Sequence, residues 1–146
     1  MNEIRNILLA EDDPNDVELT LSALAEQKLA ANIEVVRDGA EALDYLFRRG
    51  KFASRPSGDP VVVLLDLNMP KVNGLEVLHR IKTDENLKRV PVVAFASSQD
   101  SANVKRCYEY GVNAYVVKPV GSPDFSNAVK QLGAFWGLVN QPPLDP

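Results

Sequence analysis

Three short apolar runs in this chain each end in charged side chains, and that pattern constrains the fold more than any other feature. The runs and the residues that follow them are Val61–Leu65 with Asp66, Asn6–Ala10 with Glu11–Asp13, and Ala114–Val117 with Lys118. Short runs rich in branched apolar residues are typical of buried parallel strands. A charged group directly after such a strand lies at the edge of the sheet where open α/β sheets carry their chemistry.

Helical patterns separate these runs, so strand and helix alternate five times. After the first strand, Asp13 and Pro14 resemble a helix cap and a first helical residue, and apolar residues then recur at helical spacing. Asp38 and Glu41 have the spacing of a capping box at the second helix. The two remaining strands are expected at Ile33–Val36 and Val92–Ala96. This alternation predicts a parallel sheet with helices on both faces.

Composition limits the function classes. The chain has 146 residues, enough for one domain, with 45% hydrophobic and 25% charged residues. No apolar stretch approaches the ~20 residues of a membrane span, and no leader pattern opens the sequence. A single cysteine, Cys107, fits a reducing compartment. We therefore expect a cytoplasmic protein without a membrane partner, and the net charge of −4 argues against nucleic acid.

The charged ends of the strands predict a phosphoryl-transfer site. Its residues are Glu11, Asp12, Asp66 and Lys118. Each pair of carboxylates 4 Å apart repels by roughly 4 kcal/mol at an effective dielectric of 20, so a cation is required. Mg²⁺ suits such oxygen ligands, and a lysine ammonium holds a phosphoryl oxygen while a carboxylate attacks in line. A purely structural ion cluster at the sheet edge is the alternative.

These segments resemble the receiver domain of bacterial two-component response regulators. The resemblance covers nearly the whole chain and rests on Leu8–Pro14, Leu64–Pro70 with Gly74, and Tyr115–Pro119. It implies a flavodoxin-like, doubly wound (βα)5 fold with a five-stranded parallel sheet in the order 2-1-3-4-5. It also implies a protein that accepts phosphate from a histidine kinase and is not an enzyme beyond Mg²⁺-dependent phosphorylation and dephosphorylation of itself.

The resemblance assigns a role to each residue of the site. Asp66 is the phosphoacceptor, and Asp12, Asp66 and the backbone carbonyl of Asn68 hold Mg²⁺, with Glu11 helping through water. Lys118 contacts the phosphoryl group.

Further positions concern the conformational switch. Tyr115 matches an aromatic residue that turns inward on activation, and the peptide bond before Pro119 is expected to be cis. Receivers usually carry Ser or Thr where this chain has Ala96. Strand alternation points Ser97 away from the site. Four options stay open: Ser97 or Ser98 replaces the hydroxyl after a backbone shift, the Ser97 amide does so, or the switch is weak.

The end of the chain predicts a homodimer. The last helix is expected to begin at Ser122 and to stop at Gly137, which divides the chain into a receiver domain, 1–136, and a C-terminal arm, 137–146. Phe135 and Trp136 point about 100° apart on a helix, so one faces the sheet and the other lacks cover. A two-fold partner that contacts the last helix and the C-terminal arm would cover it; a tail folded on its own subunit is the alternative.

A narrower resemblance and three competing functions complete the sequence reading. The long Gly50–Asp59 loop and the Ala134–Leu138 segment, in place of an output domain, resemble single-domain regulators that partner phytochrome-type kinases.

A constitutive binding module, with the switch uncoupled by Ala96, is the main alternative function. A haloacid-dehalogenase phosphatase would place Asp where this chain has Asn68. A flavin site would need a Ser/Thr/Gly-rich phosphate loop after the first strand.

Overall fold

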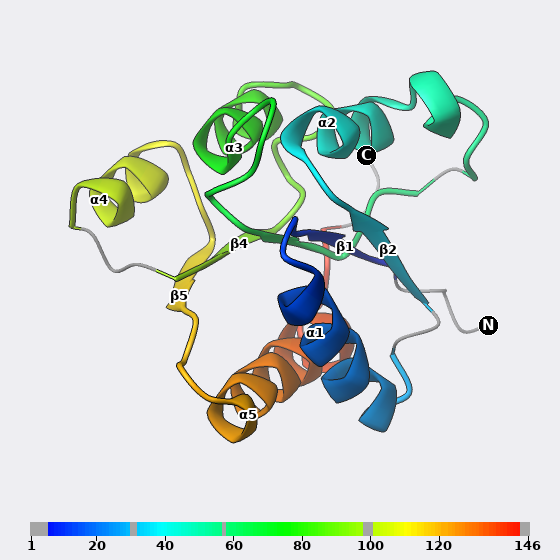
Figure 1. Cartoon of the computed structure of the whole chain (residues 1–146). Helices are drawn as coiled ribbons and strands as arrows, with labels where there is room; N and C mark the ends of the chain where they lie inside the picture. Colours follow the sequence, from blue (N-terminus) through cyan, green and yellow to red (C-terminus); the bar gives the residue numbers. More distant parts are fainter. Residues whose placement is uncertain (1–5, 30–31, 57, 98–100, 144–146) are drawn as a thin grey trace.

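The structure is a computed structural model that describes residues 6–29, 32–56, 58–97 and 101–143. Within these residues five parallel strands form one sheet in the order β2-β1-β3-β4-β5 (Figure 1), as expected. The strands are β1 (Ile7–Ala10), β2 (Ile33–Val36), β3 (Val62–Leu65), β4 (Val92–Ala96) and β5 (Ala114–Val117). The predicted strand positions are therefore confirmed to within one residue.

Helices cover both faces of the sheet. They are α1 (Pro14–Glu26), α2 (Gly39–Phe47), α3 (Gly74–Lys82), α4 (Ser101–Glu109) and α5 (Ser122–Leu132). Figure 1 shows α1 and α5 together on one face, and α2, α3 and α4 on the other. A short 3-10 helix, η2 (Gly50–Phe52), lies in the long loop after α2. Among the described residues no helix has both the length and the apolar character that a bilayer span requires.

Side-chain caps define where three of the helices begin. Asp13 Oδ1 accepts hydrogen bonds from two backbone N–H groups of the first turn of α1, at 2.8 and 3.2 Å. Asp38 Oδ1 accepts from the Glu41 N–H at 2.8 Å, and Asn73 Oδ1 accepts from the Glu76 N–H at 3.0 Å. Because each cap satisfies N–H groups that have no partner in the helix, the strand-to-helix turns are fixed close to the sheet edge.

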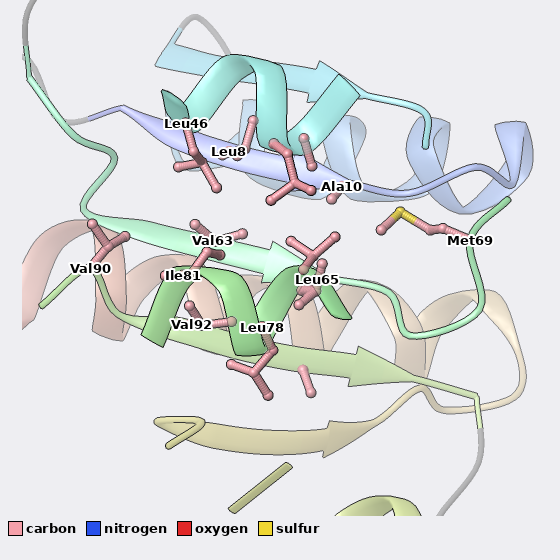
Figure 2. Packing of buried hydrophobic residues seen from close by; sticks show 14 of the residues in the cluster. Leu8, Ala10, Leu46, Val63, Leu65, Met69, Leu78, Ile81, Val90 and Val92 are labelled. Carbon is pink, nitrogen blue, oxygen red and sulfur yellow. The ribbon is translucent and has the colours of Figure 1, made fainter. Parts of the chain in front are cut away.

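The core divides at the sheet into two layers. Figure 2 shows the layer between the sheet and helices α2 and α3, formed by Leu8, Ala10, Val63, Leu65 and Val92 from the strands and Leu46, Leu78 and Ile81 from the helices. The alternate strand residues, among them Ile7, Leu9, Val62 and Leu64, form the opposite layer. Both faces of the central strands are buried, so polar chemistry is confined to the strand ends.

The strand register brings the charged residues to one edge. Ala10 of β1 pairs with Leu65 of β3, so the residues that follow them, Glu11 and Asp66, leave the sheet at the same level. Strands β4 and β5 are parallel to these and end on the same side, which places Lys118 at this edge as well. The convergence predicted from three separate strand ends is therefore a consequence of the parallel topology.

The last helix differs from the expectation. Helical structure does not stop at Gly137 but continues from α5 as a π-helix, η3 (Gly133–Val139). Gly137 is buried inside this helix because the chain passes close to the turn after α1 and to β1 there: a Cβ atom would lie 3.3 Å from Leu29 Cδ1 and 3.6 Å from Ile7 Cδ1. The glycine therefore provides room for packing and does not end the helix.

We expect Gly74→Ala to destabilise the protein although alanine favours helices. A Cβ atom at Gly74 would lie 2.3 Å from the Asp66 carbonyl oxygen. The helix-propensity gain of about 1 kcal/mol is smaller than the 1–3 kcal/mol that overpacking typically costs, and here the obstacle is backbone. Urea unfolding should show a net loss of stability, whereas Asn127→Ala, at an exposed position of α5, should change it by no more than about 0.5 kcal/mol. Equal stability of Gly74→Ala and wild type would contradict this packing account.

Candidate functional site

The predicted site residues meet in one open cavity at the carboxyl edge of the sheet. Residues from the expected set that line it are Glu11, Asp12, Asp66, Asn68 and Lys118. They come from the ends of β1, β3 and β5, so the sheet topology alone is sufficient to gather them. Four residues outside the expected set also line the cavity: Asp13, Pro14, Asp16 and Ser97.

Lys118 is the cation of this cavity. Its Nζ donates to Glu11 Oε1 at 2.5 Å and to Asp16 Oδ2 at 2.9 Å, and it lies 3.8 Å from Asp66 Oδ1. The side chain is only 8% exposed, and its own backbone N–H donates to the Ala96 carbonyl at 2.7 Å. The end of β5 therefore holds the lysine at a fixed height beside the acids.

Glu11, Asp12 and Asp66 form a group that could hold a metal ion. One carboxylate oxygen from each residue lies within 4.8 Å of the others. Glu11 and Asp66 are buried, while Asp12 is exposed at the cavity mouth. Carboxylate oxygens that converge from two strand ends onto an open cavity fit a hard divalent cation that keeps some of its waters.

The backbone orients two of the three carboxylates. Glu11 Oε2 accepts from the Asp13 N–H at 3.3 Å, and Asp66 Oδ1 accepts from the Asn68 N–H at 3.3 Å. The Asp66 N–H donates to the Ala10 carbonyl at 3.0 Å, which continues the ladder between β1 and β3 by one residue. Asp66 is thus positioned by the sheet and by its own turn.

Burial perturbs the protonation of these groups. Burial raises the pKa of Glu11 to about 7 from an ordinary value of 4.5, although hydrogen bonding and charge from Lys118 oppose that rise. Burial also raises the pKa of Asp66, again against the charge of Lys118. For Lys118 burial would lower the pKa, but hydrogen bonds to Glu11 and Asp16 outweigh it and raise the pKa. The single ammonium of Lys118 therefore does not fully offset the cost of burying the charged forms of Glu11 and Asp66.

Ser97 lines the cavity directly after Ala96, the last residue of β4. One expectation about this edge is wrong. The described residues contain no cis peptide bond, so the bond before Pro119 is trans; trans is the form that X–Pro bonds favour by about 0.5–1 kcal/mol. Ser98, considered as a substitute hydroxyl, lies outside the described residues.

The positions assigned to the switch lie on the neighbouring strands β4 and β5. Ala96 is buried at the last residue of β4, and Tyr115 is half-buried on β5, opposite Ala94. Tyr115 packs against the core layer under α2 and α3.

Asp16 was not assigned to the site from the sequence. This residue lies in the first turn of α1. The signal that could have located Asp16 is its place in the first turn of the helix that directly follows β1. That turn lies above the sheet edge, within reach of the lysine that follows β5.

The fold and this site define the response regulator receiver domain, and the family model of that name matches residues 7–130. The chain therefore belongs to this family. A curated relative is the response regulator Rcp1 of Synechocystis sp., 36% identical over 135 residues, which covers 92% of this chain and 90% of Rcp1.

Solved structures agree with this assignment. The phosphorylated cyanobacterial phytochrome response regulator RcpA superposes with a TM-score of 0.91 at 36% identity, covering 97% of this chain and all of RcpA. The bacteriophytochrome response regulator RtBRR is 53% identical, with a TM-score of 0.77, and covers 97% of this chain and 85% of its own. A Mn²⁺-bound form of Rcp1 has a TM-score of 0.87 at 34% identity, covering 96% of this chain and 99% of its own. The chain is thus homologous to phytochrome response regulators.

We expect the stability of the metal-free protein to fall as pH rises from about 4.5 through about 7, the interval between the ordinary and the raised pKa of Glu11. In this interval the native protein keeps a proton that the unfolded chain has released, so stability is greatest below the interval and lost across it. Urea unfolding in chelator at several pH values should show this slope in wild type and a flatter one in Glu11→Gln. Parallel curves for the two proteins would contradict the assignment of the slope to Glu11.

Proposed function

We propose that this protein is the phosphoacceptor of a two-component system, that Asp66 is its phosphorylation site, and that the donor is a phosphohistidine of a phytochrome-type sensor kinase. The observation that carries the proposal is the position of Asp66: it follows a central buried strand, and it shares an open cavity with four other acidic residues and a lysine. The named relatives that are phytochrome response regulators support the kinase class.

The chemistry follows from the charges around Asp66. A carboxylate oxygen of Asp66 attacks the phosphorus in line, the P–N bond of the donor breaks, and its electron pair stays on the imidazole nitrogen, which takes up a proton. Lys118, 3.8 Å from Asp66 Oδ1, is close enough to donate to a phosphoryl oxygen after a small rotation.

Glu11, Asp12, Asp66 and the backbone carbonyl of Asn68 are the groups that would hold Mg²⁺. The three carboxylates already converge, and Asn68 lines the same cavity. When bound, the ion neutralises the phosphoryl oxygens and the repulsion between the acids. The existence of a Mn²⁺-bound form of Rcp1 supports the binding of a divalent ion.

The function is tested by incubation with acetyl phosphate and Mg²⁺, followed by intact-protein mass spectrometry. We expect an adduct of about 80 Da, the mass of one phosphoryl group, and its loss in Asp66→Asn or in excess chelator. The control is Asp84→Asn, which removes one carboxylate from the turn after α3 but keeps the acceptor oxygen for the Asn86 N–H. An adduct that survives in Asp66→Asn would refute Asp66 as the acceptor.

A second candidate function, a constitutive binding module, is favoured by one observation. Ala96 has no hydroxyl at the buried end of β4, the place where receivers usually present one to the phosphoryl group. Ser97, which lines the cavity, is a candidate replacement through its hydroxyl or its backbone N–H. The two functions differ in whether phosphorylation changes the surroundings of Tyr115.

We expect Ala96→Thr to strengthen the coupling between Asp66 and Tyr115. A restored hydroxyl adds a donor worth about 0.5–1.5 kcal/mol, and more towards a charged acceptor. NMR spectra before and after phosphorylation should show larger shift changes around Tyr115 in this variant than in wild type. Ala102→Thr on the exposed side of α4 is the matched control. Equal shift changes in Ala96→Thr and wild type would argue that Ala96 does not limit the switch.

We also propose that the last helix mediates a homodimer. Phe135, Leu138 and Val139 are 48%, 55% and 71% exposed, while Trp136 packs into the core layer beneath α1 and α5. These three side chains on η3 form an apolar patch that a second copy could cover about a two-fold axis.

Replacing the patch tests the dimer without removing the helix. Phe135→Ser with Leu138→Ser should give a monomer by light scattering at concentrations where wild type is dimeric, because burial of these side chains drives association. Val120→Ser is the matched control, since Val120 is 96% exposed but lies in the loop between β5 and α5. A wild-type protein that stays monomeric at high micromolar concentration, phosphorylated or not, would contradict the proposal.

A further inference from the structure

Asp16 contacts the ammonium group of Lys118, which we propose binds the phosphoryl group. Its Oδ2 accepts a hydrogen bond from Lys118 Nζ at 2.9 Å, and its side chain is 23% exposed. Asp16 is not required as the cap of α1, because Asp13 Oδ1 already accepts from the N–H groups of Asn15 and Asp16. The charge of the Asp16 carboxylate is therefore directed at the lysine and not at the start of its helix.

The resting position of Lys118 is set by Glu11 and Asp16, and not by Asp66. An ammonium has three N–H donors. Two of them reach Glu11 at 2.5 Å and Asp16 at 2.9 Å, whereas Asp66 Oδ1 is 3.8 Å away, beyond hydrogen-bond distance. A phosphoryl group on Asp66 would have to draw the ammonium towards itself and away from at least one of these two partners.

We propose that Asp16 is a positioning residue that holds Lys118 back from Asp66 and competes with the phosphoryl group for its ammonium. The inference rests on the proposed function, since it concerns the same site. The backbone of Asp16 is held in place, because the first turn of α1 is capped by Asp13 and α1 packs against α5 on the same face of the sheet (Figure 1). Each step of the lysine towards Asp66 therefore weakens its bond to Asp16.

Asp16 differs from Glu11 in what its removal would disturb. Glu11 is buried and belongs to the three acids that could share a metal ion, whereas Asp16 is partly exposed and is not one of them. A neutral side chain at position 16 therefore frees the lysine and leaves the proposed metal ligands in place. Asp16 is thus suited to set the rate of phosphorylation independently of metal binding.

The test compares Asp16→Asn with wild type in two measurements. The first is the rate of adduct formation with acetyl phosphate at saturating Mg²⁺, followed by intact mass. We expect Asp16→Asn to react about three- to tenfold faster, as loss of part of one charge-assisted hydrogen bond would give. The second is the ¹⁵N chemical shift of Lys118 Nζ in the metal-free, unphosphorylated protein, which should move in Asp16→Asn and return towards the wild-type value in Asp16→Glu.

Glu18→Gln is the matched control, because it removes one negative charge from the exposed side of the same helix. An unmoved Lys118 signal, or a rate in Asp16→Asn that is equal to or below that of wild type, would overturn the inference. A rate increase of the same size in Glu18→Gln would overturn it as well, because loss of any negative charge from α1 would then be enough to explain the faster reaction. Wild-type protein that forms no adduct would refute the proposed function, and with it the competition, while the NMR measurement would still report the contact between Asp16 and Lys118.

Discussion

The structure depends on one electrostatic constraint: the buried carboxylates of Glu11 and Asp66 and the partly exposed carboxylate of Asp16 share a single lysine, Lys118. Carboxylates about 4 Å apart repel by roughly 4 kcal/mol per pair at an effective dielectric of 20, and the raised pKa of Glu11 reflects the cost of burying this charge. Lys118 offsets part of it through Glu11 and Asp16. The residual negative charge makes the cavity receptive to a divalent cation, and the cation in turn makes it receptive to a phosphoryl group.

The parts of this arrangement that follow from parallel strands were predictable from sequence. Asp66, Glu11 and Lys118 each follow an apolar run, and parallel strands place their carboxyl ends at one edge of the sheet. The convergence of these three residues could therefore be predicted without a structure. The place of Ser97 in the cavity lining was not predictable, because it depends on the chain beyond the last residue of β4. The continuation of the last helix through Gly137 was not predictable either, because the close packing of this glycine against Leu29 is a tertiary contact.

Receiver domains share a common set of charged residues, so the individual behaviour of this chain depends on the residues around that set. Ala96 removes a hydroxyl from the buried end of β4, Asp16 gives the lysine a second partner, and Phe135 exposes an aromatic ring on η3. In the functions proposed above, each of these features concerns a different step: coupling to Tyr115, transfer to Asp66, and assembly. The proposal is therefore that switching and association can vary while the shared charged residues stay the same.

Localisation of the phosphoryl group tests the central claim most directly. Acyl phosphates are reduced by borohydride, so protein treated with acetyl phosphate and Mg²⁺, reduced and digested, can be mapped by tandem mass spectrometry. The account predicts that the reduced residue is Asp66 and that no reduction occurs when Mg²⁺ is chelated. Reduction at Glu11, Asp12 or Asp16 in place of Asp66, or undiminished labelling in chelator, would contradict it.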